Sequence, residues 1–259
     1  MSIINTHNNF RARLLQGDTL VGTFMKTPSM MLAEVLGGTP LDVICLDAEH
    51  SPFDRRDLDT CLLAFRAANK PTLVRIPNNR PEYILNALDC GTTGILVPHV
   101  ATPEQAFNAA KAARYGDGGR GYAGSPRAAG YASATITENL EHNQTETTVV
   151  AQIEDLPALD SIEEIAAVEG IDCLFIGVMD LTVALGASGP KKPEVIAACE
   201  KICRAAVDHN QKLGMFVPNI ADVPFWAERG VTLFLMASDH AFVKQGAAAL
   251  TDSVRQVCS

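Results

Sequence analysis

Several features that mark nucleic-acid-binding, membrane and secreted proteins are missing from this sequence of 259 residues. Its 21 Lys and Arg are scattered and are outnumbered by 30 Asp and Glu, for a net charge of −9, whereas a phosphate backbone requires a basic face. No stretch approaches the roughly 18 apolar residues of a membrane span, and the N-terminus MSIINTHNNFRARLL lacks the apolar run of a signal peptide. We therefore expect a cytoplasmic protein with no nucleic-acid or membrane partner.

The sequence also lacks any CxxC pair. It has an odd number of cysteines, most of them inside apolar runs: Cys45, Cys61, Cys90, Cys173, Cys199, Cys203 and Cys258. An odd count without paired spacing favours reduced thiols in the core or on helix faces, as is usual in the cytosol.

No linker or low-complexity break divides the chain, and no GxGxxG follows the first β-type run. Instead, short runs rich in β-branched or aromatic residues alternate with longer amphipathic stretches. The predicted strands are 20–25, 43–48, 72–76, 94–98, 148–153, 173–178, 214–218 and 232–237. Apolar strands that alternate with helices predict a parallel sheet covered on its outer face. Eight such units in about 250 residues favour one closed (β/α)8 barrel, residues 1–259, over an open doubly wound sheet.

One connection in this pattern is unusually long. Residues 115–147 separate the fourth helix from the fifth strand and carry GDGGRGYAGSPRAAGY. A long glycine-rich excursion inside a compact domain is usually functional or an oligomer contact.

Two carboxylates follow adjacent predicted strands. In a (β/α)8 barrel the chemistry lies at the carboxyl ends of the strands, and Glu154 and Asp180 stand after the fifth and sixth. Like charges held close together repel, and a hard divalent cation such as Mg²⁺ or Mn²⁺ removes the repulsion. Two solvated acids at strand ends are the alternative that the sequence leaves open.

Several histidines also follow strands. His50 comes directly after an apolar strand and is a candidate general base, because imidazole titrates near neutral pH; a structural role is equally compatible with its position. Asp89, on the helix after the third strand, could orient His50 or could be a solvated acid at a helix end. His99 and His240 are candidate substrate contacts.

Arg75 lies inside an otherwise apolar strand. Burying a guanidinium without a partner is costly, so Arg75 must face either a protein carboxylate or a bound anionic substrate. An arginine, a metal and a base together suit proton or carbon–carbon chemistry next to a 2-oxo acid, because the arginine and the metal stabilise an enolate oxygen.

Five ordered segments, DAEHSPFD, VRIP, ALDCGTTGILVP, VAQIE and EGIDCLFIGVMDLTVALG, resemble the signature segments of the HpcH/HpaI class II aldolases, which include 4-hydroxy-2-oxoheptanedioate and 2-dehydro-3-deoxyglucarate aldolases. The resemblance implies a TIM barrel of the phosphoenolpyruvate/pyruvate type with Mg²⁺, Mn²⁺ or Co²⁺. It also implies reversible cleavage of 4-hydroxy-2-oxo acids to pyruvate and an aldehyde, through a metal-bound pyruvate enolate. A homo-oligomer, a hexamer or trimer with exchanged C-terminal helices, is implied as well.

The resemblance assigns roles to the residues that match the family's motifs. Glu154 and Asp180 match the metal ligands. His50 matches the catalytic base, and Asp89 matches its dyad partner. Arg75 matches the arginine that stabilises the pyruvate enolate.

Further positions match supporting roles. Gln152 matches a glutamine close to the metal and pyruvate. The backbone around Gly177 and Met179 is where the pyruvate carboxylate is expected. Asp47 and Glu49 match acids that support the site through waters.

The chain departs from the family pattern at two places. It carries GVMDLT from Gly177 to Thr182 where the family commonly has GPxDLS, and His99 stands in VPHV where an apolar residue is usual. These changes border the substrate, so they bear on the preference for the acceptor aldehyde more than on the metal.

Other functions remain compatible with the same residues. An oxaloacetate-type decarboxylase passes through the same enolate, and a non-catalytic barrel that binds oxo acids would use the same pocket. A Schiff-base aldolase would need Lys26, the lysine that stands at a strand end. In the long connection, Arg120 and Arg127 could bind a distal anionic group of the aldehyde or could form an intersubunit contact.

Overall fold

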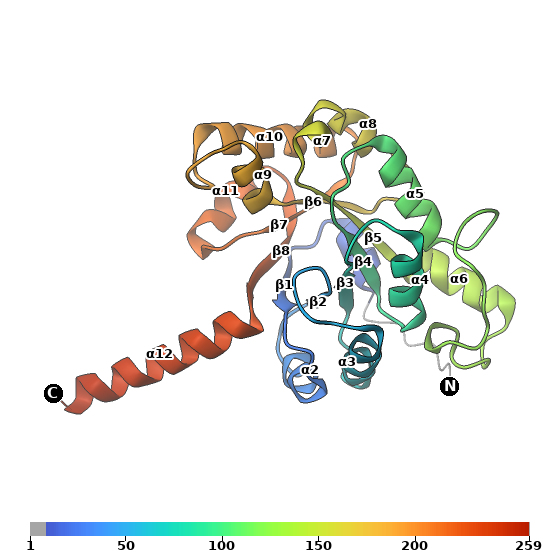
Figure 1. Ribbon diagram of the computed structural model, residues 1–259, viewed down its shortest axis with the longest axis horizontal. Helices are drawn as coiled ribbons and strands as arrows, with labels where there is room; N and C mark the ends of the chain where they lie inside the picture. Colours follow the sequence, from blue (N-terminus) through green and yellow to red (C-terminus); the bar gives the residue numbers. More distant parts are fainter. Residues whose placement is uncertain (1–8, 259) are drawn as a thin grey trace.

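Eight runs of β-branched and aromatic residues form the strands of a closed parallel barrel in the computed structural model, which describes residues 9–258 (Figure 1). The strands are β1 (Leu20–Met25), β2 (Val43–Asp47), β3 (Thr72–Arg75), β4 (Gly94–Val97), β5 (Thr148–Ile153), β6 (Cys173–Ile176), β7 (Lys212–Phe216) and β8 (Val231–Ser238). Because β8 pairs with β1, the sheet has no free edge. The predicted (β/α)8 TIM barrel is confirmed.

The predicted strand boundaries differ from the observed ones by up to two residues. The largest differences are at β6, which ends at Ile176 because Val178 already begins a helix, and at β7, which begins at Lys212. Apolar residues alone do not distinguish the end of a buried strand from the start of the helix after it.

Helices cover the outside of the barrel. They are α1 (Phe10–Gln16), α2 (Met30–Gly37), α3 (Arg55–Ala67), α4 (Pro81–Asp89), α5 (Pro103–Ala113), α6 (Ile136–Glu146), α7 (Leu156–Asp160), α8 (Ile162–Ala166), α9 (Val178–Ala184), α10 (Pro193–Asp208), α11 (Val223–Ala227) and α12 (Asp239–Cys258). Short 3₁₀ turns lie at Arg127–Ala129 and Ile220–Asp222. The long connection before β5 thus contains a helix, α6. Thr135 and Glu138 begin it with a reciprocal capping box that the sequence analysis overlooked.

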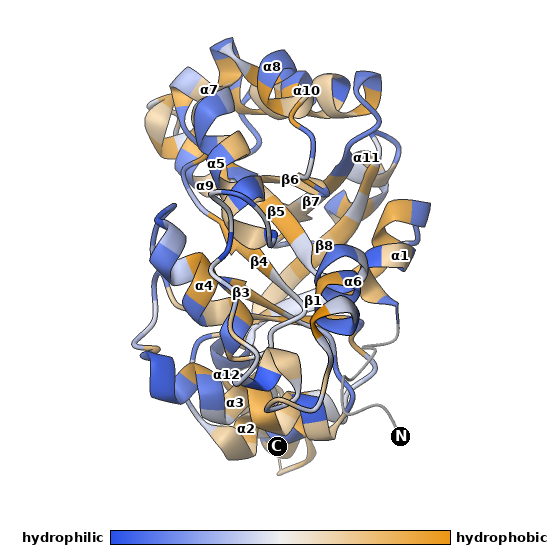
Figure 2. Cartoon of the chain, turned by 90° about the vertical axis from the view of Figure 1, so that its right-hand side faces the viewer, coloured by the Kyte–Doolittle hydropathy of each residue, from blue (hydrophilic) through white to orange (hydrophobic). Residues whose placement is uncertain are grey.

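The two faces of each strand have different neighbours. Outward residues such as Ile44 and Val74 belong to the cluster between barrel and helices, whereas Cys45, Leu73 and Phe175 belong to the cluster inside the barrel. Figure 2 shows the hydrophobic residues concentrated on the strands and on the helix faces that cover them. Side chains alternate between the two faces of a strand, so a residue two positions after an inward-facing residue also faces inward. Asp47 and Arg75, which follow the inward-facing Cys45 and Leu73 by two positions, therefore face the inside of the barrel at its carboxyl end.

The amino end of the barrel is closed by α1. Phe10 and Leu14 are fully buried in the same cluster as the interior side chains of the strands. The carboxyl end, by contrast, carries polar residues in its inner rows.

The last helix, α12, extends away from the barrel to the C-terminus (Figure 1). Its exposed large apolar residues are Phe242, Val243, Leu250, Val254 and Val257. Across residues 9–258, no helix combines the length and the apolar character needed to cross a bilayer. Residues 1–8, where the sequence analysis looked for a signal peptide, lie outside the described residues.

Candidate active site at the carboxyl ends of the strands

A pocket opens at the carboxyl ends of the strands, and many of the predicted site residues line it. Its lining includes His50, Arg75, Gln152, Gly177, Met179 and Asp180. The aromatic rings of Phe24, Phe175 and Phe216 form apolar walls beside them. Residues up to about 190 positions apart in the sequence therefore face one space, as the barrel topology requires.

Arg75 and Asp47 form a two-pronged ion pair at the floor of this site. Arg75 Nε and Nη2 donate to Asp47 Oδ1 and Oδ2 at 2.9 and 2.7 Å, and both residues are buried. Burial opposes both charges, but Arg75 outweighs it and lowers the pKa of Asp47, while Asp47 raises the pKa of Arg75. The sequence left open whether Arg75 faces a protein carboxylate or a substrate. The structure gives it the carboxylate and also places it in the pocket wall.

Asp47 organises the turn after β2 as well. Its Oδ1 accepts the backbone N–H of His50 at 3.1 Å, and Lys26 Nζ lies 3.1 Å from its Oδ2. Lys26 lines the pocket, but its side-chain nitrogen is paired with the fully buried carboxylate of Asp47.

Glu154 is buried at the end of β5 and is held by two donors. Its Oε1 accepts the backbone N–H of His99 at 2.9 Å, and its Oε2 accepts from Gln152 Nε2. Burial nevertheless raises the pKa of Glu154, and the charge of Asp180 adds to the rise.

Gly177 leaves room for the side chain of Glu154. A Cβ at this position would lie 2.6 Å from Glu154 Cβ and 2.7 Å from Glu154 Oε2. A side chain at position 177 would displace the carboxylate. Directly after Gly177, α9 begins at Val178 and carries Asp180 in its first turn.

His99 lies among three carboxylates. Its Nδ1 is 3.1 Å from Asp155 Oδ2 and 3.5 Å from Glu154 Oε1, and its Nε2 is 3.5 Å from Glu49 Oε1. Burial opposes protonation of the ring, but these carboxylates, Glu154 foremost, raise the pKa of His99. For the carboxyl group of Glu49, burial raises the pKa, and the charge of Arg75 offsets part of this effect. The sequence indicated His99 as a candidate substrate contact and as a departure from an apolar position, but not as a neighbour of Glu154.

The donors and acceptors around Glu154 fit a divalent cation. Glu49 Oε2 and Gln152 Oε1 are buried oxygens with no hydrogen-bond donor, and oxygens of this kind are the ligands of hard divalent ions. One atom each from Glu49, His99 and Glu154 lie within 4.8 Å of one another. Burial raises the pKa values of Glu49 and Glu154. The positive charge of a cation here would oppose that rise by favouring the ionised carboxylates.

His50 is in the pocket, but Asp89 is not beside it. His50 Nε2 lies 3.7 Å from Glu49 Oε2, whereas Asp89 accepts a hydrogen bond from Arg120 Nη2 at 2.6 Å. Asp89 is the last residue of α4, which runs back from the carboxyl end of β3 and so ends at the opposite end of the barrel. Within one chain Asp89 therefore does not lie beside His50, because the direction of α4, not the proximity of Asp89 to β3 in the sequence, decides where Asp89 lies. The catalytic dyad of His50 and Asp89 stays a prediction.

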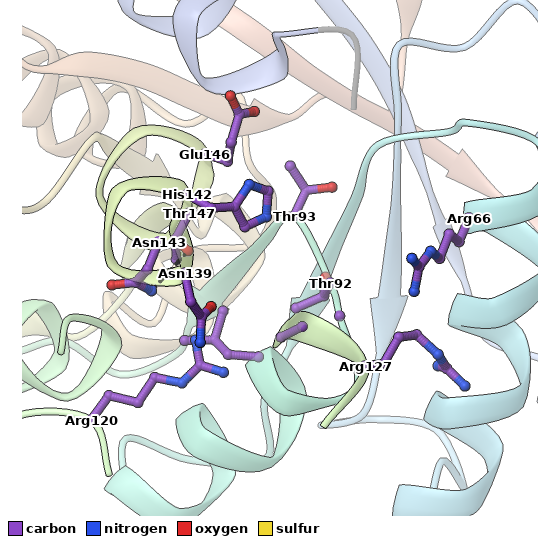
Figure 3. A pocket seen from close by; sticks show the side chains of 13 residues that line it. Arg66, Thr92, Thr93, Arg120, Arg127, Asn139, His142, Asn143, Glu146 and Thr147 are labelled. Atoms are coloured by element: carbon purple, nitrogen blue, oxygen red, sulfur yellow. Dashed lines mark hydrogen bonds between the residues drawn. The ribbon is translucent and has the colours of Figure 1, made fainter. Parts of the chain in front are cut away.

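Arg120 and Arg127 also lie at the amino end of the barrel, where they line a separate polar pocket with Asn139 and His142 (Figure 3). Arg127 Nη1 donates to the carbonyls of Asp59 and Cys90 at 2.8 and 3.0 Å. Within one chain, these arginines do not reach the carboxyl-end pocket, which corrects the hypothesis that they bind the substrate of the same barrel.

Asp239 and His240, which follow β8, form hydrogen bonds to the residues that follow β1. Both carboxylate oxygens of Asp239 accept backbone N–H groups, from Lys26 at 2.8 Å and Thr27 at 3.0 Å. His240 Nε2 lies 3.0 Å from Thr27 Oγ1. Asp239 thus joins the end of β8 to the end of β1.

Comparisons with known proteins agree with this fold. The family described as HpcH/HpaI aldolase/citrate lyase matches residues 20–245. A 5-keto-4-deoxy-D-glucarate aldolase from Klebsiella pneumoniae subsp. pneumoniae is 34% identical over 251 residues, covering 96% of this chain and 97% of the relative.

Two solved structures are similar over nearly the whole chain. One is an HpcH/HpaI aldolase/citrate lyase family protein from Burkholderia cenocepacia J2315, with a TM-score of 0.90, 30% identity and coverage of 96% of this chain and 99% of that one. The other is an HpcH/HpaI aldolase from Desulfitobacterium hafniense DCB-2, with a TM-score of 0.87, 26% identity and coverage of 95% and 96%.

The Asp47–Arg75 pair generates a prediction about stability and pH. Asp47→Asn leaves a buried guanidinium without its counter-charge and should lower the free energy of unfolding by about 3–5 kcal/mol at neutral pH. Because the folded-state pKa of Asp47 is depressed, its contribution is present above the unfolded-state value, near about 4, and is lost as pH falls through the folded-state value.

Urea unfolding from pH 7 to pH 3 measures this. The gap between wild type and Asp47→Asn should shrink below pH of about 4, while Asp117→Asn, at an exposed loop position, should track wild type throughout. A gap that stays constant with pH would show that the pair does not titrate as described.

Proposed function

Because this chain belongs to the HpcH/HpaI aldolase/citrate lyase family and is a carbon–carbon lyase, we propose that it is a divalent-metal-dependent class II aldolase that cleaves 4-hydroxy-2-oxo acids to pyruvate and an aldehyde. One observation carries the proposal. Asp180 and Arg75 line one pocket together with Gln152, whose amide donates to the buried Glu154.

Glu154 and Asp180 would hold the cation, with the unpaired Gln152 Oε1 beside them. When bound, Mg²⁺, Mn²⁺ or Co²⁺ would act as a Lewis acid that offsets negative charge on the 2-oxo oxygen. Gly177 is required because a larger residue would collide with Glu154.

Arg75 supplies fixed positive charge to the same oxygen. Its Nε and Nη2 are committed to Asp47, so the guanidinium cannot swing away, and the group still lines the pocket. A preorganised donor of this kind stabilises an enolate without a reorganisation cost during the reaction.

The first turn of α9 would bind the carboxylate of the 2-oxo acid. The first N–H groups of a helix have no acceptor within the helix and point toward anions, and this helix starts at Val178 beside Gly177 and Met179. Val178 keeps an N–H that a proline at this position would lack, so the GVMDLT variant offers one more donor here.

His50 would accept the proton of the C4 hydroxyl, directly or through one water. The C3–C4 bond then breaks, the aldehyde leaves, and the electron pair of the bond forms the enolate of pyruvate. Protonation at C3 gives pyruvate. Phe24, Phe175 and Phe216 line the space and would limit the access of water to the enolate.

The named relatives support an aldol substrate derived from a 2-oxo acid, since the Klebsiella protein is called a 5-keto-4-deoxy-D-glucarate aldolase. We propose the substrate class and leave the aldehyde to the assay. Oxaloacetate decarboxylation would use the same enolate, and a barrel that binds oxo acids without reacting would use the same pocket.

The metal requirement is tested by pyruvate release. Chelator-treated enzyme should cleave no 4-hydroxy-2-oxo acid, and added Mg²⁺, Mn²⁺ or Co²⁺ should restore activity, measured by coupling to lactate dehydrogenase across substrates of several chain lengths. Glu154→Gln should stay inactive with metal, because the amide removes one anionic ligand.

Full activity in metal-free enzyme would refute the proposal. If the metal-loaded enzyme releases pyruvate from oxaloacetate but from none of the 4-hydroxy-2-oxo acids, it is a decarboxylase. If no substrate reacts although 2-oxo acids bind, the barrel is a binding protein.

The role of His50 is tested by His50→Ala. Loss of a general base should lower kcat by about 10²–10⁴-fold, while the affinity for the metal stays close to that of wild type because His50 is not among the proposed ligands. His240→Ala, which removes a histidine bonded to Thr27, is the matched control. Unchanged turnover in His50→Ala would remove His50 from the mechanism.

We also propose that the protein is a homo-oligomer, a trimer or hexamer, in which α12 packs on a neighbouring subunit. This helix is long and extends from the barrel, and Val243, Leu250, Val254 and Val257 are exposed at helical spacing along it. Apolar residues that recur in this way form a contact face when a partner covers them.

The oligomer is tested with charges on that face. Leu250→Asp combined with Val254→Asp should lower the mass measured by light scattering after size exclusion, because two carboxylates cannot be buried at an apolar contact. Ala248→Asp, about opposite on the helix, is the control and should keep the wild-type mass. An unaltered mass in the double variant would exclude α12 from the interface.

A further inference from the structure

Three strand ends bring one histidine and two glutamates together. Glu49 follows β2, His99 follows β4 and Glu154 follows β5. One potential ligand atom from each lies within 4.8 Å of the others. The family resemblance implies Glu154 and Asp180 as the metal ligands, and these two roles do not explain why His99 lies in this cluster.

The distance between His99 Nε2 and Glu49 Oε1 fits a shared ion better than a direct hydrogen bond. These two atoms lie 3.5 Å apart, whereas good hydrogen bonds between such groups are about 2.7–3.2 Å long. Two atoms that each bind one ion at about 2.1 Å lie roughly 3.0–3.4 Å apart, depending on whether the geometry is octahedral or tetrahedral.

The backbone of His99 is held in an uncommon conformation. Its φ is 54°, in the left-handed region, and its N–H donates to Glu154 Oε1 at 2.9 Å. Non-glycine residues keep such a conformation where the surrounding structure holds it, often at functional sites. Here the conformation ties the chain at position 99 to the buried carboxylate.

The opposite side of the ring has the partner that metal-binding histidines usually have. Nδ1 lies 3.1 Å from Asp155 Oδ2. A ligating imidazole commonly donates its second N–H to a carboxylate, which fixes the tautomer and directs the other nitrogen at the ion. An Nδ1–H bond to Asp155 would leave the lone pair of Nε2 on the side of Glu49.

Glu49 carries a buried oxygen that lacks a hydrogen-bond donor. Its Oε2 accepts no hydrogen bond. Arg75 Nε is 3.4 Å away, but this nitrogen already donates to Asp47 at 2.9 Å. The charge of Arg75 offsets only part of the effect of burial on Glu49, so a second cation beside this carboxylate would lower the cost of burying it.

We propose that Nε2 of His99 is a nitrogen ligand of the divalent metal held by Glu154, with Glu49 beside it and Asp155 orienting the ring. This rests on the metal site of the proposed function. Imidazole suits Co²⁺, Ni²⁺ and Zn²⁺, whereas Mg²⁺ selects oxygen ligands. His99 therefore shifts the preference of this chain toward the transition metals and away from Mg²⁺.

The test measures metal binding by the full-length protein, independent of turnover. Dissociation constants for Co²⁺ and Mg²⁺ are measured by calorimetry for wild type, His99→Asn and His99→Met. His99→Asn keeps a residue that tolerates positive φ but is too short to reach the ion, so it guards against misfolding of the methionine variant. Both variants should weaken Co²⁺ binding by about 10- to 100-fold and leave Mg²⁺ binding nearly unchanged.

Pulsed electron paramagnetic resonance of the bound Mn²⁺ identifies the ligand directly. Wild type should show the ¹⁴N coupling of a coordinated imidazole, and both His99 variants should lose it. His50→Gln removes a different histidine of the same pocket and should retain the coupling. Asp155→Asn should retain the coupling and weaken Co²⁺ binding by less than the His99 variants do.

The outcomes separate this inference from the proposed function. If wild type binds Mn²⁺ without ¹⁴N coupling, or if the ratio of Co²⁺ to Mg²⁺ affinity is unchanged in both His99 variants, His99 is not a ligand while the metal site itself stands. If wild type and Glu154→Gln both fail to bind any divalent ion, the metal-dependent function fails as well.

Discussion

The ion pair between Arg75 and Asp47 is the interaction on which the rest of the site depends. Asp47 is fully buried at the end of β2, and the guanidinium of Arg75 meets both of its oxygens. The same carboxylate accepts the His50 N–H and lies beside Lys26. One buried charge pair therefore sets the turn that carries Glu49 and His50. The pair also fixes the guanidinium of Arg75, which without Asp47 would be free to move and to be solvated.

The remaining charges of the pocket are not balanced in this way. Glu154 and Glu49 are buried carboxylates whose pKa values are raised, and each lies near an oxygen that accepts no hydrogen bond. The barrel supplies positive charge on one side, through Arg75, and leaves a deficit on the other, around Glu154. A divalent cation placed between these groups would correct the deficit, and the enolate chemistry proposed for the family needs positive charge at that place. His99 adds a nitrogen to an otherwise oxygen-rich set.

The two ends of the barrel have separate tasks. Chemistry-bearing groups gather at the carboxyl end, while α1 plugs the amino end with Phe10 and Leu14. The polar pocket around Arg120 and Arg127 lies at the amino end (Figure 3). Asp89 lies at the same end, where it accepts a hydrogen bond from Arg120. Because each helix reverses the chain direction after a strand, residues ten or fifteen positions beyond a catalytic strand belong to the opposite end of the same barrel.

The sequence by itself determined the barrel and most of the pocket. Apolar runs at regular spacing predicted the strands, and the rule that parallel strands end together predicted that Arg75, Gln152 and Asp180 would face one mouth. These inferences succeeded because they depend on local periodicity and on topology. Tertiary structure alone decided the pairings. Arg75 meets Asp47 because β2 and β3 are paired with positions 47 and 75 side by side, and His99 meets Glu154 because a left-handed turn brings its N–H to β5. Asp89 pairs with Arg120 and not with His50 because the direction of α4 carries it away. Such contacts depend on register, backbone conformation and helix direction in three dimensions, which the order of residue types along the chain does not specify.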